Sequence, residues 1–338
     1  VIKQRLTGFK TNYEFQKTLV YPFLQNLEAN LTKGIDIVGV NNIETTKPYL
    51  YISNHRDIIL DSAFLCAKLI ELGMDTVEIA IGDNLLIYPW IKKVVRINKS
   101  FIVQRALTMR QMLEASALMS NYMHYTIRDK KQSIWIAQRE GRAKDSNDRT
   151  QDSVLKMLAM GGEGSVLERL AEMNIAPLSL SYEYDPCDYL KAQEFQLKRD
   201  VEGYKKSTQD DLLNMKTGLF GFKGRVHFQV AELINDDLLK LDASLPKTEL
   251  FACVSALIDR KIHANYRLYP GNYVACDLLD GTTTFAGNYS AEEKQTFEDY
   301  IAGQLDKISI PNKDVEFLRE KLLVMYANPV INYLAASR

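Results

Sequence analysis

Short apolar runs that alternate with longer helical patterns constrain the fold of this chain more than any other feature. Six runs have the length and composition of β-strands, at residues 48–53, 76–82, 101–105, 133–138, 175–182 and 224–232. The clearest helical pattern between them covers 106–129, where Leu107, Met109, Met112, Leu113, Leu118 and Met119 are expected to form a buried face. This alternation predicts an α/β fold with a mixed, largely parallel sheet flanked by helices.

The two ends of the chain have a different pattern. Residues 11–33 form an amphipathic helical pattern that Pro22 interrupts. After about residue 240 only helices are expected, at 247–262, from a capping box at Ser290 towards Leu305, and at 313–327 with Pro329 beyond the end. We therefore predict an N-terminal amphipathic helical segment (1–34), an α/β domain (35–240) and a C-terminal helical extension (241–338) packed on the same domain.

The composition excludes several classes of function. The 338 residues carry a net charge of -1, which argues against a nucleic-acid partner. The four cysteines and four histidines are scattered and show no CxxC spacing, so we expect neither a metal site nor structural disulfides, and a reducing compartment. No uninterrupted apolar stretch approaches the ~20 residues of a membrane span, and no signal peptide is expected.

The turn after the run 48–53 contains a histidine and, six residues later, an aspartate. His55 and Asp61 lie in the sequence YISNHRDIILDS, residues 51–62. A neutral imidazole takes a proton from a hydroxyl near pH 7, and a carboxylate on its other nitrogen fixes the tautomer. No nucleophilic Ser or Cys is obvious beside them, so such a base would act on the substrate. The alternative is that Asn54 or Asp57 caps the next helix and His55 is only a turn residue.

Charged residues follow other predicted strands. Arg105 ends the run 101–105, and Glu140-Gly141-Arg142 follows the run 133–138. Because ligands of open α/β sheets bind at the strand ends, we expect these residues to converge with His55 on one crevice. Arginine offers a planar, permanently charged fork for phosphate or carboxylate, and glycine allows a close approach of the backbone.

In this order and spacing the chain resembles the glycerophosphate acyltransferase superfamily, the lysophosphatidate, glycerol-3-phosphate and lyso-lipid O-acyltransferases. That family has an Asn-His followed by an Asp, a Phe-x-x-Arg, a Glu-Gly-x-Arg and a Pro in an apolar strand. The corresponding residues here are Asn54-His55 with Asp61, Phe101 to Arg105, Glu140-Gly141-Arg142, and Pro177. The resemblance covers about residues 35–235.

The chain departs from the family pattern at three places. The carboxylate comes one place late at Asp61, with Asp57 as a competitor for the histidine; we favour Asp61, because a neighbour at i+2 rarely faces the same side. The second motif has one extra residue before Arg105, and the third lacks its usual Thr. These departures resemble a divergent branch of bacterial "glycerol acyltransferase"-like proteins, some of which resemble enzymes that acylate lyso-aminolipids.

The resemblance implies a glycerol-3-phosphate acyltransferase-like fold and an O-acyltransferase of membrane lipid synthesis. His55 would be the general base, oriented by Asp61. Arg105 and Arg142 would hold the acceptor's phosphate or carboxylate, Glu140 would bind its hydroxyls or position Arg142, and Gly141 and Pro177 complete the implied substrate site. Backbone N–H groups at the start of the helix after His55 are expected to stabilise the oxyanion.

The implied partners are an acyl carrier protein or coenzyme A thioester as acyl donor and a lyso-lipid or glycerol phosphate as acceptor, with no cofactor. One alternative acceptor is a lyso-aminolipid of the ornithine- or glycine-lipid type. An alternative of another class is a non-catalytic protein that binds acyl chains or lipids. We expect a cytoplasmic protein, peripheral to the inner face of the cytoplasmic membrane.

Two sequence features bear on membrane contact. Residues 85–90 contain Tyr88 and Trp90, which favour interfaces, but the same run is equally compatible with core packing. A group of basic residues either docks an acyl carrier protein or anionic lipid, or is a solvated charged face; it consists of Lys92, Lys93, Arg96 and Lys99.

Overall fold

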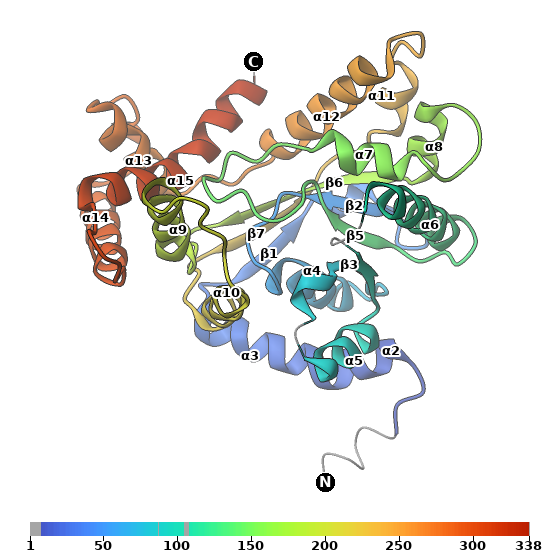
Figure 1. The fold of residues 1–338 in the computed structure, drawn as a ribbon, viewed down its shortest axis with the longest axis horizontal. Coiled ribbons are helices and arrows are strands. Elements are labelled where there is room, and N and C mark those ends of the chain that lie inside the picture. The colour runs from blue at the N-terminus through green and yellow to red at the C-terminus, as the bar shows by residue number, and fades with distance from the viewer. Residues whose placement is uncertain (1–7, 87, 105–107, 338) are drawn as a thin grey trace.

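A seven-stranded sheet with helices on both faces forms the centre of the molecule (Figure 1). The computed structural model describes residues 8–86, 88–104 and 108–337. The strand order is β1-β7-β6-β2-β5-β3-β4, and within the described residues every neighbouring pair is parallel except β6 and β7. The strands are β1 (Ile35–Val38), β2 (Leu50–Ser53), β3 (Glu78–Gly82), β4 (Ser100–Val103), β5 (Ile134–Ala137), β6 (Ile175–Tyr182) and β7 (Val226–Val230). The predicted fold class is confirmed, and β1 is the strand that the sequence patterns missed.

The helices divide between the sheet faces and a separate C-terminal group. They are α2 (Asn12–Phe15), α3 (Tyr21–Leu31), α4 (Leu60–Glu71), α5 (Pro89–Ile97), α6 (Met109–Arg128), α7 (Asp152–Leu158), α8 (Val166–Glu172), α9 (Asp188–Asp200), α10 (Thr208–Phe220), α11 (Asn235–Leu239), α12 (Lys247–His263), α13 (Pro270–Asp280), α14 (Ala291–Asp306) and α15 (Val315–Ala336). One core cluster joins α3 and α4 to the sheet, and a second joins α6, α7, α8 and α12 to the opposite face. A third cluster holds α9, α13, α14 and α15 together. The division at residue 240 stays a prediction.

Strand β2 is buried on both faces, as a central parallel strand should be. The side chains of Leu50 and Ile52 belong to the core under α6 and α12, whereas Tyr51 between them belongs to the core under α4. This burial explains why residues 48–53 read as a continuous apolar run. It also fixes the point at which the chain leaves the sheet, directly before His55.

The opening helix continues through Pro22 by changing its geometry. Residues Gln16–Val20 are π-helical and lead directly into α3, in whose first turn Pro22 lies. A proline in a helix removes one N–H donor and its ring crowds the preceding turn, and the wider π turn relieves that conflict. The interruption expected at Pro22 is therefore a local widening of one helical segment.

The expected buried face of residues 106–129 is wrong for the first half of α6. The exposed fractions are 76% for Met109, 46% for Met112, 58% for Leu113 and 74% for Leu118. Only the second half is buried, around Met123 and Ile127. Periodicity shows that a helix has an apolar face, but it does not show whether another element covers that face. Leu107 lies outside the described residues.

Pro329 is the second departure from expectation. It lies inside α15, which begins at Val315 and continues to Ala336, and does not follow its end. Helix α15 packs against α13 and α9, and Val330 beside the proline is fully buried. Packing on neighbouring helices therefore outweighs the loss of one helical hydrogen bond.

Candidate active site

His55 and Asp61 lie side by side where β2 ends and α4 begins. The Nδ1 atom of His55 is 2.7 Å from Oδ2 of Asp61, and the side chains are 13% and 0% exposed. The turn between the strand and the helix lets a carboxylate six residues away reach the ring. The ring also contacts Trp135 of β5 edge-on, with 5.7 Å between the centroids. Since Nδ1 faces the carboxylate, it carries the proton in the neutral imidazole and leaves Nε2 as the acceptor.

Three further donors hold the Asp61 carboxylate. Oδ2 accepts hydrogen bonds from the backbone N–H groups of Arg56 at 2.7 Å and Asp57 at 3.1 Å. Oδ1 accepts from the Tyr182 hydroxyl at 3.0 Å. Burial, together with the charge of Asp61, raises the pKa of Tyr182 well above its usual value, so this hydroxyl stays protonated and donates. The carboxylate that orients His55 is thus fixed from β6 as well as from its own turn.

Asp57 does not compete for the histidine, because it caps α4. Its Oδ1 accepts from the N–H groups of Ile59 and Leu60, both at 2.8 Å. Burial and the nearby Asp61 raise the pKa of Asp57. The helix-cap reading of this turn is therefore right for Asp57, alongside the His55–Asp61 pair. It also corrects one expectation: the N–H groups of residues 56, 57, 59 and 60 serve these two carboxylates and are not open to an oxyanion.

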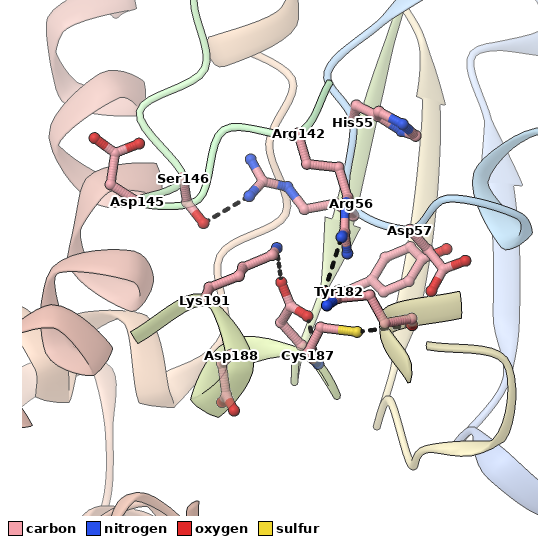
Figure 2. Close-up of polar contacts among 12 residues, drawn as sticks. His55, Arg56, Asp57, Arg142, Asp145, Ser146, Tyr182, Cys187, Asp188 and Lys191 are labelled. Carbon is pink, nitrogen blue, oxygen red and sulfur yellow. Dashed lines mark hydrogen bonds and ion pairs between the residues drawn. The ribbon is translucent and has the colours of Figure 1, made fainter. Parts of the chain in front are cut away.

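Asn54 ties the end of β2 to β6. Its amide oxygen accepts from Leu180 N at 2.8 Å, and its amide nitrogen donates to Leu180 O at 2.9 Å. The next side chain along, Arg56, turns away from His55 and donates to Ser146 at 2.6 Å (Figure 2). Arg56 also forms a buried ion pair with Asp148. The residues on both sides of His55 therefore have structural partners that hold the turn in place.

A largely apolar cavity of about 770 Å³ opens beside His55. Helices α3, α4, α5, α6, α7 and α10, the π-helical residues before α3 and strand β3 supply most of its walls. Its polar end is formed by His55, Trp135, Arg139, Glu140 and Gly141. Of the residues predicted to converge at the strand ends, His55, Glu140 and Gly141 line this one cavity, because β2 and β5 are parallel neighbours whose carboxyl ends meet.

The Glu-Gly-Arg turn divides between two environments. Glu140 and Gly141 line the cavity, Glu140 N donates to Gln151 at 2.6 Å, and Gly141 has a φ of 72°, which favours glycine. Arg142 is not among the cavity-lining residues. Its side chain donates to Asn214 at 3.0 Å and lies beside Asp57 and Cys187, while the His55 ring points to another side (Figure 2).

Of the other two predicted substrate residues, the structure describes Pro177, which does not line the cavity. Arg105 lies outside the described residues. Pro177 is buried within β6, opposite Ile52 of β2, and its carbonyl accepts from Ala231 N at 2.9 Å. The roles predicted for these residues stay predictions.

Sequence reasoning missed two residues of the site. Tyr182 is the last residue of β6, and its position at a strand end is the sequence feature that could have identified it as a site residue. Arg139 is two residues beyond β5, and strand alternation places it on the same face as Trp135 and Ala137. Both signals were present in the apolar runs 175–182 and 133–138.

A family model matches part of this chain. Residues 34–180, less than half of the 338 residues, match the family model Acyltransferase. The matched segment contains the His55–Asp61 pair and the Glu140-Gly141 turn, and over this segment the comparison supports the resemblance to acyltransferases that the sequence motifs indicated. No curated protein matches the sequence significantly.

Among solved structures, the chain is similar to the 1-acyl-sn-glycerophosphate (LPA) acyltransferase PlsC from Thermotoga maritima. The match has 10% sequence identity and a TM-score of 0.42, and it covers 76% of this chain and 86% of that one. The similarity to the family model is confined to residues 34–180.

Proposed function

We propose that this protein moves a fatty acyl group from an acyl thioester, carried by acyl carrier protein or coenzyme A, to a hydroxyl of a lyso-lipid or glycerol phosphate. One observation carries the proposal: the His55–Asp61 pair opens into a cavity of about 770 Å³ that is mostly apolar. A general base at the polar end of a long apolar space suits a reaction between a hydroxyl and an acyl chain.

The chemistry follows from the tautomer of His55. Its Nε2 takes the proton of the acceptor hydroxyl, and the alkoxide attacks the thioester carbonyl. The tetrahedral intermediate collapses and expels the thiolate, which recovers the proton from the imidazolium. Asp61 holds Nδ1–H throughout and stabilises the charged ring. No covalent intermediate on the enzyme is needed.

The apolar part of the cavity accounts for the acyl chain. Side chains of α4, such as Ala63, Cys66 and Ile70, form one wall, and residues of α3 and α6 form others. Burial of each methylene contributes about 0.8 kcal/mol, so a fatty acyl chain provides most of the binding free energy of the donor.

Contact with a membrane surface is supported by helix α5. Trp90, Val94 and Ile97 form an exposed apolar stripe at helical spacing, with exposed fractions of 62%, 44% and 40%. Lys92 lies on the opposite side of the helix from the stripe and Lys93 borders it, as in helices that rest at a lipid interface. Tyr88 stacks on Trp90, with 6.5 Å between the rings, so these two aromatic residues are not packed in the core.

The exposed first half of α6 also borders the cavity, through Met112, Ala115 and Ser116. We propose that the protein lies against the inner face of the cytoplasmic membrane, with the cavity opening to the lipid. In the part of the chain that the structure describes, none of the helices combines the length and hydropathy needed to cross a bilayer.

The test is thiol release from acyl carrier protein and coenzyme A thioesters in the presence of glycerol 3-phosphate, lysophosphatidate or lyso-aminolipids. Release that depends on an acceptor, and that His55→Gln abolishes, is expected. His227→Gln is the matched control, because His227 also pairs with an aspartate, Asp36, at 2.9 Å, but lies outside the cavity.

The outcomes separate the alternatives. Release only with lyso-aminolipids would assign the acceptor to that class. Binding of the thioester without release, on folded protein, would replace the proposal by a lipid-binding function. Equal loss of activity in both histidine variants would show that the effect is structural and not catalytic.

A further inference from the structure

The polar end of the cavity contains a guanidinium without a partner. Arg139 lines the wall, and its Nε atom is buried with no hydrogen-bond acceptor. Within the described residues Arg139 makes no hydrogen bond or ion pair. A charge in low-dielectric surroundings is costly unless an opposite charge or strong acceptor meets it. The arrangement therefore favours an anionic ligand at this position.

His55 and Arg139 follow the ends of two neighbouring parallel strands. Ser53, the last residue of β2, is opposite Ala137, the last residue of β5, and Gln138 N donates to Ser53 O at 2.8 Å. His55 and Arg139 come two residues after this pair, and both line the cavity. The carboxyl ends of parallel neighbours meet at one edge of the sheet, so the two residues lie at the same edge.

The remaining charges make Arg139 distinctive. Among the described residues that line the cavity, Arg139 is the one lysine or arginine, and Glu140 is the one carboxylate. Arg142, which the family resemblance assigned to the acceptor, is instead directed to Asn214 in the buried cluster with Asp57 and Cys187.

We propose that Arg139 binds the anionic group of the acceptor, a phosphate or a carboxylate, and so places the acceptor's hydroxyl at His55 Nε2. This inference rests on the proposed acyl transfer for its catalytic meaning, but the anion site itself does not depend on it. A planar guanidinium beside the base selects acceptors whose anionic group and hydroxyl are a few bonds apart.

The first experiment measures binding alone. Dodecyl phosphate, dodecanoate and dodecanol are titrated against the protein, and tryptophan fluorescence is followed, because Trp135 lies in the cavity wall. The intact protein should bind dodecyl phosphate about 10- to 100-fold more tightly than dodecanol, the range of a charge-assisted hydrogen bond. Arg139→Gln should remove that preference, and leave the affinity for dodecanol unchanged.

Three comparisons make the result specific. Arg139→Lys keeps the charge without the planar fork and should retain part of the preference. Arg260→Gln removes an arginine from the exposed end of α12 and should bind all three probes as the intact protein does. Because Arg139 has no partner among the described residues, Arg139→Gln should not lower the melting temperature. An unchanged phosphate preference, or an equal loss for dodecanol, would overturn the proposal.

Kinetics then identify the source of the anion. Arg139→Gln should raise KM for lysophosphatidate, or for an N-(3-hydroxyacyl) amino acid, about 10- to 100-fold. KM for the acyl thioester and the rate with neutral monoacylglycerol should not change. If the intact protein transfers no acyl group yet Arg139→Gln loses phosphate binding, the proposed function fails and the anion site stands. If transfer occurs and the variant keeps its KM for the anionic acceptor, the anion site is wrong.

Discussion

The Tyr182 hydroxyl lies 3.0 Å from Oδ1 of Asp61, on the oxygen that His55 does not use. The tyrosine comes from the end of β6, whereas the aspartate comes from the first turn of α4. This contact joins two elements 121 residues apart at the group that orients the base. Tyr182 is therefore a positioning residue for the proposed catalytic pair, and it acts through Asp61.

Tyr182→Phe should lower kcat about 3- to 10-fold, because a hydrogen bond to a charged group contributes about 1.5–3 kcal/mol and part of that loss reaches the transition state. KM for both substrates should stay close to that of the intact protein, because Tyr182 contacts Asp61 and does not line the cavity. A loss of activity that appears as a raised KM, or that accompanies a lowered melting temperature, would indicate a structural role alone.

Tyr51→Phe is the matched control for this variant. The Tyr51 hydroxyl is buried and has no hydrogen-bond partner among the described residues. Its removal should raise the free energy of unfolding, by about 1 kcal/mol, since a buried polar group without a partner is destabilising. Chemical denaturation measures this change, and kcat should stay as in the intact protein.

Asp61→Asn should lower kcat/KM by about 10²- to 10⁴-fold, because an amide no longer selects the tautomer that leaves Nε2 free. Asp36→Asn is the comparison, since Asp36 also accepts from a histidine, His227, at 2.9 Å and is half exposed. Steady-state kinetics on both variants measure the difference. Comparable losses in the two variants would contradict a catalytic role for the Asp61 carboxylate.

Much of the fold could be predicted from the sequence, because the central strands are buried on both faces. Residues 48–53 and 175–182 are mostly apolar for that reason, with serines at 53, 179 and 181, and both runs contain strands. Strand β1 was missed because it is short and only its first residue is buried, so it lacks that signature. The predicted buried face was wrong for the first half of α6, because an apolar helix face does not show whether another element covers it.

Part of the candidate site could be predicted from the sequence. The strand-end rule brought His55 and the Glu140-Gly141 turn together correctly, since it depends only on parallel neighbours. The sequence did not predict where each arginine side chain points, because that direction depends on contacts with residues far away in the sequence. Arg142 is directed to Asn214, whereas Arg139, three residues earlier, lines the cavity.

Membrane contact through α5 and α6 is tested by placing a charge on their exposed apolar residues. Ile97→Asp, Met109→Asp and Leu113→Asp should each weaken binding to vesicles of phosphatidylglycerol and phosphatidylcholine about 10-fold, the scale of burying one large apolar side chain. None of the three lines the cavity, so activity on short-chain soluble substrates should remain. Co-sedimentation with vesicles measures the binding.

Leu239→Asp is the control for these surface changes, because Leu239 is 59% exposed at the end of α11, away from the cavity wall. It should leave vesicle binding unchanged. If all four variants sediment with vesicles as the intact protein does, the face formed by α5 and α6 does not contact the membrane.

His263 should make the fold sensitive to acid. Its side chain is buried, and Nε2 donates to Asp148 O at 2.8 Å. Burial, with Arg149 and Arg56 nearby, lowers the pKa of His263 to about 4. Because the folded pKa lies below the unfolded value, the unfolded chain binds more protons between these values, and stability is lost as the pH falls through this window. Between pH 7 and pH 5 this loss is about 2 kcal/mol.

His263→Gln retains a donor for the Asp148 carbonyl but does not titrate, so it should lose about 2 kcal/mol less than the intact protein between pH 7 and pH 5. Urea denaturation at both pH values measures the difference. The comparison between the two proteins is needed because Asp188 acts in the opposite sense: burial raises its pKa to about 7, so its contribution is lost as the pH rises. That contribution is common to both proteins and cancels, so equal pH slopes would show that His263 is not the titrating group.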